Sequence, residues 1–474
     1  MTAGKSSKPL LGLTLLYTVG NLATRLINFG LVFVTTFYLT KEEVGDYDLF
    51  IITLSLLTPI ATLQLAESAL RWLLEDSNPE RIQKTFSNIL VLLTLSLSIL
   101  GLILAGLRFL AVFPNEIKLY ILIFFQSYFI VFQQIVRGIG NNPLFVKSSI
   151  LYSLVYAILA VVSLMFTQHK IDGLIWANIA GSILTCTYLF FSAGLAKYFT
   201  LTGFSTSFSR SLLVYSIPLI PNTLSWWAIS SANRYFSLIY CGKAANGIFS
   251  ISQKIPTMLL LFTGIFYQAW QEKSISLTGD KNSGAYHARI FDIYIRIMFT
   301  ITIGIVTTSR LLLKFLVSPQ FFESWKYTSI LLLGVIFNSL SSFLGTSYLS
   351  RKDTRGAMFS SLVGGGLTIL VSWFLIPAFG LYGAGFGTLI GYFMVFAIRN
   401  YDAYRYYNIH FPYGLFTSFM LLFFFSSALN YLNSGWIDAA NILISGLALL
   451  FINWNFLKDL LAQRRKSTLK PIQS

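Results

Sequence analysis

The sequence predicts an all-α protein that crosses a membrane many times. Hydrophobic residues occupy 55% of the 474 positions and charged residues only 11%, about half of the charged fraction that is usual in soluble domains. Apolar runs of roughly 20 residues, the length that spans a bilayer core, recur along the whole chain. So many runs in series leave too little polar surface for a soluble fold, so we expect a polytopic membrane protein.

Hydropathy and loop signals predict fourteen spans, beginning with an apolar run that is too long for a signal peptide. Their approximate ranges are 11–39, 48–68, 86–107, 119–136, 148–167, 173–196, 211–239, 247–270, 290–313, 327–349, 357–378, 383–400, 412–431 and 436–457. Pro218 and Pro221 fall inside the seventh span, where they are expected to kink the helix.

Three pairs of similar segments indicate an internal repeat. EVGDYDLF at 43–50 resembles AANGIFSI at 244–251, GLIWANIAG at 173–181 resembles GAGFGTLIG at 383–391, and NNPLFVKSS at 141–149 resembles RGAMFSS at 355–361. Repeats that flank a central site are typical of transporters. The sequence therefore predicts two six-helix lobes, 1–196 and 197–402, followed by two further spans and a basic tail within 403–474.

The distribution of lysine and arginine predicts that both termini are cytoplasmic. With the N-terminus inside, the inside segments hold 22 of the 34 basic residues and the outside loops hold seven. This bias follows the positive-inside rule and explains most of the formal net charge of +16. Because the charge is spread over short loops, it is attributed to topology and anionic lipid, and no nucleic-acid partner is expected.

Cysteine and histidine usage predicts neither a disulfide framework nor a metal site. Cys186 lies within a span and Cys241 near a helix end, and the three histidines fall in expected loops without ligand spacing. No GxxxxGK[ST] loop occurs, so the chain is not expected to hydrolyse ATP, and no cofactor is expected.

Four basic residues inside predicted spans are candidates for a site: Arg25, Arg234, Lys254 and Arg296. A central arginine costs roughly 2.5–3.5 kcal/mol on insertion scales, so such residues face a partner, a bundle interior or a water-filled cavity. Arg296 lies one turn after Asp292, a spacing that predicts a structural ion pair. Arg25 has no acidic neighbour in sequence and is expected to face a cavity, whereas for Lys254 a cavity position and outward snorkelling are equal alternatives.

The segment IPNTLSWWAISSANRYF at 220–236 surrounds Arg234 with polar and aromatic residues. Aromatic rings can stack on sugars, and amides can form hydrogen bonds with sugar hydroxyl groups. The candidate sugar contacts are Asn222, Trp226, Trp227 and Asn233, with ordinary packing as the alternative for each tryptophan. For Arg234 itself, a cavity position is favoured over a structural ion pair.

The sign of the intramembrane charge favours an anionic ligand. Basic side chains occur within the predicted spans, and hardly any carboxylate is expected there away from the cytoplasmic edge. An exporter of organic cations would need such carboxylates, whereas a cationic cavity suits a phosphate or pyrophosphate head group.

Two regions carry a resemblance to the polysaccharide biosynthesis flippases. RLINFGLVFVTTFYLTKEEVGDYDLF at 25–50, with its E-x-G-x-Y turn, resembles the first spans of these proteins. YSIPLIPNTLSWW at 215–227, NRYF at 233–236 and GIFSISQKI at 247–255 are similar to the start of their second half. The same superfamily contains multidrug and toxin extruders and the peptidoglycan-precursor flippase. Asn233 is a departure, because members of the family often have an acidic residue there.

The resemblance implies a flippase of the bacterial inner membrane that translocates undecaprenyl-pyrophosphate-linked oligosaccharides for O-antigen or capsule-like polysaccharide. It implies a V-shaped bundle with alternating access, in which Arg25, Arg234 and Lys254 occupy helices that contact the anionic head group. A polysaccharide polymerase is a candidate partner. The alternatives are an exporter of another lipid or a drug from the same superfamily, and a membrane glycan polymerase or ligase, for which the outside loops are too small and apolar.

Overall fold

The computed structural model describes residues 10–76, 78–108, 115–200, 203–276, 283–350, 354–407, 411–432 and 435–458. The first residues of the chain, His410 and most of the predicted basic tail lie outside these ranges. All regular structure in the described ranges is helical, which confirms the predicted fold class. The tertiary contacts divide the chain into two compact units, Met1–Gly247 and Ile248–Ser474. The lobe boundary expected between residues 196 and 197 stays a prediction.

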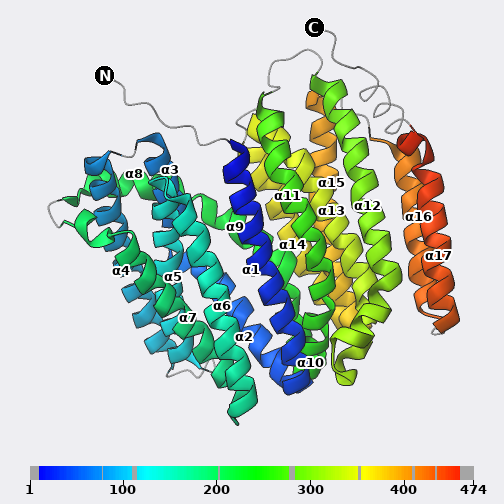
Figure 1. The fold of residues 1–474 in the computed structure, drawn as a ribbon, viewed down its shortest axis with the longest axis horizontal. Helices are drawn as coiled ribbons and strands as arrows, with labels where there is room; N and C mark the ends of the chain where they lie inside the picture. Colours follow the sequence, from blue (N-terminus) through cyan, green and yellow to red (C-terminus); the bar gives the residue numbers. More distant parts are fainter. Residues whose placement is uncertain are drawn as a thin grey trace, which may run out of the picture. The chain divides into compact units, whose positions relative to one another are not determined.

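The described residues of the first unit form ten α-helices, the last of which, α10, is kinked at Gly242 and ends in the second unit (Figure 1, blue to green). They are α1 Leu10–Tyr38, α2 Lys41–Ala61, α3 Leu65–Glu75, α4 Pro79–Arg108, α5 Glu116–Gly138, α6 Asn142–Phe166, α7 Lys170–Ser192, α8 Thr206–Ser216, α9 Leu219–Trp227 and α10 Asn233–Ser252, with the short helices η1 Leu195–Tyr198 and η3 Ala228–Ala232. Helix α1 packs against α6, α6 against α7, and α5 against both α3 and α7. Side chains such as Leu65, Leu93 and Leu122 are fully buried in its core.

The second unit is built around α13 and α15 (Figure 1, green to red). Its helices are α11 Lys254–Ser276, α12 Ser283–Leu316, η4 Pro319–Ser324, α13 Trp325–Ser350, α14 Thr354–Phe379, α15 Leu381–Tyr407, α16 Tyr413–Asn430 and α17 Gly435–Ile452. Helix α12 packs against both α16 and α17. Arg310 Nη1 of α12 lies 3.2 Å from Asp438 Oδ1 of α17. The two C-terminal helices therefore belong to this unit.

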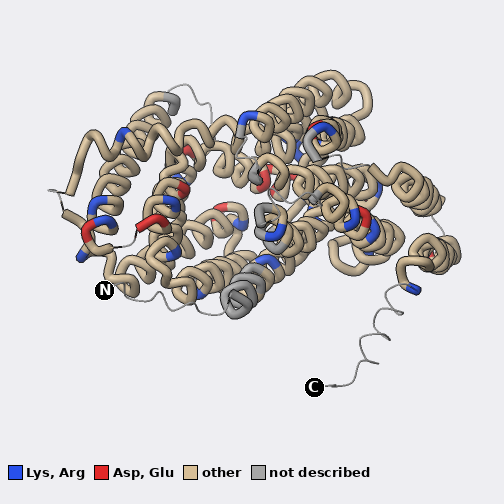
Figure 2. Tube along the Cα trace, turned by 90° about the horizontal axis from the view of Figure 1, so that it is seen from above, with Lys and Arg blue, Asp and Glu red and all other residues tan. Residues whose placement is uncertain are grey.

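The helices have the length and the surface of membrane spans. Among the described residues, twelve helical segments are long and apolar enough to cross a membrane, and Leu22–Tyr38 is a shorter apolar helix. One of the twelve, Thr206–Tyr267, has 62 residues, which is enough for more than two crossings. Large apolar side chains such as Leu102 and Phe166 are exposed on the helices, and charged residues are sparse along the trace (Figure 2). The chain is a multi-pass membrane protein.

Two predicted spans are interrupted in the structure. The span expected at 48–68 is α2 followed by α3, because Leu63 and Gln64 adopt left-handed backbone angles with φ of 49° and 53°. The span expected at 211–239 breaks at Ile217 and Pro218, between α8 and α9. Proline has no N–H to donate to the preceding turn, so the discontinuity predicted from the prolines is present.

Candidate functional site

The candidate site lies where the first turns of α2 meet α10. Helix α2 begins with a capping box, in which Thr40 Oγ1 accepts from the Glu43 N–H at 3.2 Å and Glu43 Oε2 accepts from the Thr40 N–H at 2.8 Å. This reciprocal cap fixes the start of the helix. The glutamate of the E-x-G-x-Y turn therefore sets the register of the residues that follow, including Asp48.

Arg234 forms a buried ion pair with Asp48. Its Nη1 lies 2.5 Å from both carboxylate oxygens, and the side chains of Arg234 and Asp48 are 8% and 7% exposed. The cavity position favoured for Arg234 is therefore not observed, because its guanidinium group is buried against the carboxylate of Asp48. Asp48 stands 186 positions away in the sequence and at the end of a predicted span, so only tertiary packing reveals it as the partner.

Two glycines bring the backbones of α2 and α10 into contact. A Cβ atom on Gly45 would collide with the carbonyl oxygen of Lys243. A Cβ atom on Gly247 would collide with the carbonyl oxygen of Lys41. Lys243 lies four positions before Gly247, and Lys41 lies four positions before Gly45, so the two contacts are equivalent. A two-fold axis produces equivalent contacts of this kind. The repeated segments EVGDYDLF and AANGIFSI therefore meet each other at these glycines.

Polar contacts accompany the two glycines. Lys243 Nζ lies 3.0 Å from Asp46 Oδ2, and Asn246 Nδ2 donates to the Gly45 carbonyl oxygen at 3.1 Å. We name this region the α2–α10 seam, and it comprises Gly45, Asp46 and Asp48 on α2 with Arg234, Lys243, Asn246 and Gly247 on α10. The seam combines close backbone packing with two charge pairs, one exposed and one buried.

The comparisons identify the family. The sequence profile of the family described as polysaccharide biosynthesis protein matches residues 11–271. The chain belongs to the polysaccharide biosynthesis protein family. The matched range contains both sides of the α2–α10 seam. A comparison with curated protein sequences gives no significant match.

Solved structures show the fold of this polysaccharide biosynthesis protein. The lipid II flippase MurJ in an inward closed conformation is 17% identical with a TM-score of 0.69, over 94% of this chain and 100% of that chain. A multidrug resistance MATE family transporter of the MOP superfamily in an inward-facing conformation is 13% identical with a TM-score of 0.64, over 81% of this chain and 94% of that chain. A MOP superfamily transporter from Pyrococcus furiosus is 12% identical with a TM-score of 0.58, over 84% of this chain and 94% of that chain. The family member thus shares the fold of these solved structures.

The other predicted site residues of this family member differ in how far their side chains are buried. Arg25 is exposed on α1, and Lys254 is the partly buried first residue of α11 in the second unit. Asn233, beside Arg234, is fully buried. Trp227 Nε1 donates to the Ile52 carbonyl oxygen of α2 at 3.0 Å. The roles of these residues in binding cargo stay predictions.

Helix α9 carries the two remaining candidate sugar contacts. Asn222 and Trp226 are partly buried there. The π-helix η3 separates α9 from Arg234, and π-helical turns occur frequently at functional sites. Whether Asn222 and Trp226 contact a sugar stays a prediction.

The second unit holds one predicted ion pair and one unpredicted arginine. Arg296 Nε lies 2.9 Å from Asp292 Oδ2, as the spacing predicts. Arg296 Nη1 also donates to the Ile452 carbonyl oxygen at 3.2 Å, so it fastens α12 to α17. Arg399, only 6% exposed, donates to Ser360 Oγ at 3.1 Å. The position of Arg399 inside the predicted span 383–400 was the signal that could have identified it.

Proposed function

We propose that the protein is a flippase that moves undecaprenyl-pyrophosphate-linked oligosaccharide across the bacterial cytoplasmic membrane. The family and the flippase-type fold support a transporter of this kind. A diphosphate with a hydrophilic glycan cannot cross about 30 Å of hydrocarbon unaided, although its polyprenyl chain can remain in lipid. The single observation that favours anionic cargo is Arg234, an arginine buried inside a membrane segment.

Arg234 would have different counter-ions in different states of the transport cycle. In this structure Asp48 holds its guanidinium group within the seam. If α2 and α10 separate during alternating access, Arg234 loses the carboxylate. A phosphate group offers the guanidinium group similar charge-assisted hydrogen bonds. Arg234 would then stabilise the closed seam in one state and bind the cargo head group in the other.

The predicted orientation of the chain would put the seam at one side of the membrane. With cytoplasmic termini, as the lysine and arginine distribution predicts, the start of α2 lies at the external face. The closed α2–α10 seam would then shut the external end, and its opening would release cargo towards a polysaccharide polymerase, the proposed partner on that side.

Export of a cationic drug or another lipid is the second candidate. Such an exporter needs a carboxylate within the membrane, and Asp48 is a buried carboxylate on α2. Its pairing with Arg234 neutralises the charge in this structure, which keeps the anionic cargo as the first candidate. A glycan polymerase or ligase is the least supported, because the structural relatives are transporters and flippases.

The deciding experiment is deletion of the gene followed by chemical identification of lipids on the cytoplasmic face. We expect an undecaprenyl-pyrophosphate-linked oligosaccharide to accumulate there, while surface polysaccharide disappears. Increased sensitivity to cationic drugs without any accumulated glycan lipid would instead support the second candidate.

Replacement of Arg25 by alanine is expected to impair polysaccharide export. Arg25 is exposed on α1, and the loss of hydrogen bonds from a charged group, about 1.5–3 kcal/mol, corresponds to a roughly 10–100-fold weaker cargo interaction. Export would be measured as surface polysaccharide at matched membrane abundance. Arg25→Lys is the control and should retain part of the activity, because it keeps the positive charge. Normal export by Arg25→Ala would remove Arg25 from the site.

A further inference from the structure

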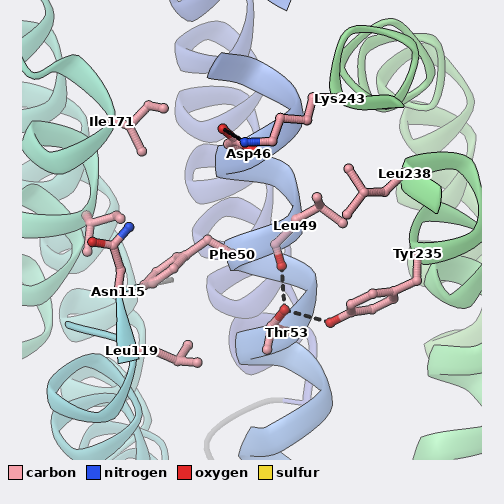
Figure 3. A pocket seen from close by; sticks show the side chains of 11 residues that line it. Asp46, Leu49, Phe50, Thr53, Asn115, Leu119, Ile171, Tyr235, Leu238 and Lys243 are labelled. Atoms are coloured by element: carbon pink, nitrogen blue, oxygen red, sulfur yellow. Dashed lines mark hydrogen bonds and ion pairs between the residues drawn. The ribbon is translucent and has the colours of Figure 1, made fainter. Parts of the chain in front are cut away.

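A pocket of about 440 Å³ opens beside the seam, between α2, α5, α7 and α10 (Figure 3). Its walls are mostly apolar and include Leu49, Phe50, Leu119, Ile175 and Leu238. This volume lies within the range of pockets that bind small ligands. A predominantly apolar wall favours a hydrocarbon group, because a group of this kind leaves no polar atom unpaired against that wall.

At the end of the pocket formed by Thr53 and Tyr235, the hydroxyl groups form hydrogen bonds within the protein and do not require a polar ligand. Thr53 Oγ1 donates to the Leu49 carbonyl oxygen at 2.6 Å, and it lies 2.6 Å from the Tyr235 hydroxyl oxygen (Figure 3). Threonine has one hydroxyl hydrogen, so Tyr235 is the donor in the second bond. Both hydroxyl groups therefore use their hydrogens within the protein, and the side chains around them can receive an apolar group.

The other end of the pocket carries two opposite charges. The side chains of Lys243 and Asp46, 3.0 Å apart, are 56% and 37% exposed. An ammonium group has three donors and a carboxylate about four acceptor sites, so each can bind a further group. Asp46 and Thr53 are seven residues apart on α2, which makes the pocket about 10 Å long. A charged end and an apolar interior match an amphipathic molecule.

We propose that this pocket binds one hydrocarbon chain of a phospholipid with a zwitterionic head group. The phosphate would contact Lys243, and the ammonium group of the lipid would contact Asp46. A polyprenyl pyrophosphate fits less well, because its charge is entirely negative and Asp46 would repel it. The residues that line this pocket are not among the proposed cargo contacts.

The bound lipid would also stabilise the closed seam. Helices α2 and α10 both line the pocket, so their separation would dismantle it. A ligand that binds only one of two states shifts the equilibrium towards that state. The effect on transport rests on the proposed flippase function, whereas the binding of the lipid does not.

The binding test compares Leu238→Trp with Ile239→Trp in the purified full-length protein. Leu238 lines the pocket, whereas its neighbour Ile239 is 68% exposed. Native mass spectrometry would count the phosphatidylethanolamine molecules that each variant retains. We expect Leu238→Trp to retain one phosphatidylethanolamine molecule fewer than the unmodified protein, because the larger side chain occupies the space of the hydrocarbon chain. Ile239→Trp should retain lipid as the unmodified protein does.

The head group is tested by competition with phosphatidylglycerol, which is anionic. The unmodified protein should prefer phosphatidylethanolamine, and Asp46→Asn should shift the preference towards phosphatidylglycerol, because the pocket entrance then carries only the positive charge of Lys243. If Leu238→Trp folds poorly, Ile171→Trp blocks the same pocket from α7. Equal retention by the blocked and control variants would overturn the site. A preference of the unmodified protein for phosphatidylglycerol or a polyprenyl phosphate would overturn the proposed occupant.

Discussion

Replacement of Asp48 by alanine is expected to destabilise the first unit by about 3–5 kcal/mol, because it removes the carboxylate from a buried arginine. For a unit of this size, such a loss lowers the Tm by roughly 6–20 °C. The measurement is thermal unfolding of the purified protein in detergent. Asp46→Ala is a matched control two positions away, where the ion pair with Lys243 is partly exposed and is worth about 0–1 kcal/mol.

A double replacement separates the two proposed roles of Arg234. Asp48→Leu combined with Arg234→Met removes both charges, and an apolar substitute for a buried ion pair is often neutral or stabilising. We expect this variant to regain the stability that Asp48→Ala loses, yet to remain inactive in polysaccharide export if Arg234 binds the cargo. Full export by a stable double variant would leave Arg234 only a structural role. Equal stability of Asp48→Ala and Asp46→Ala would contradict the buried pair itself.

Gly247→Leu is expected to lower the closed-to-open equilibrium constant of the α2–α10 seam about 5–150-fold. Its side chain would meet the backbone carbonyl oxygen of Lys41, and overpacking of this kind costs about 1–3 kcal/mol. The readout is the yield of a short thiol cross-linker between cysteines introduced at Asp46 and Lys243, with Cys186 and Cys241 replaced.

The control for this substitution is Gly30→Leu on α1, where a Cβ atom would meet no atom within 4 Å. Gly45→Leu should reproduce the effect of Gly247→Leu, because the two glycines make the same contact from opposite helices. An unchanged cross-linking yield in both seam variants would show that the backbone contact does not control closure.

The helices were predictable because the length of an apolar run is a local property of the chain. The breaks in the helices were predictable only in part. Pro218 predicts the break between α8 and α9, whereas hydropathy does not predict the left-handed backbone angles of Leu63 and Gln64 between α2 and α3. The glycine segments were recognised as repeats, but their mutual contact requires tertiary structure. The same holds for Asp48, whose carboxylate stands at the edge of a predicted span and finds Arg234 through packing of distant helices.

The reciprocal glycine contact bears on the ancestry of the chain. KEEVG at 41–45 and KAANG at 243–247 carry lysine and glycine at the same spacing, so an ancestral half-length chain with this segment would have presented a self-complementary surface to a second copy. The charges of the buried pair are not repeated, because the positions 202 residues from Asp48 and Arg234 are Ser250 and Val32. Duplication would thus have supplied the symmetric contact between the two glycines. The ion pair between Asp48 and Arg234 would have been added later by substitution on one side of that contact.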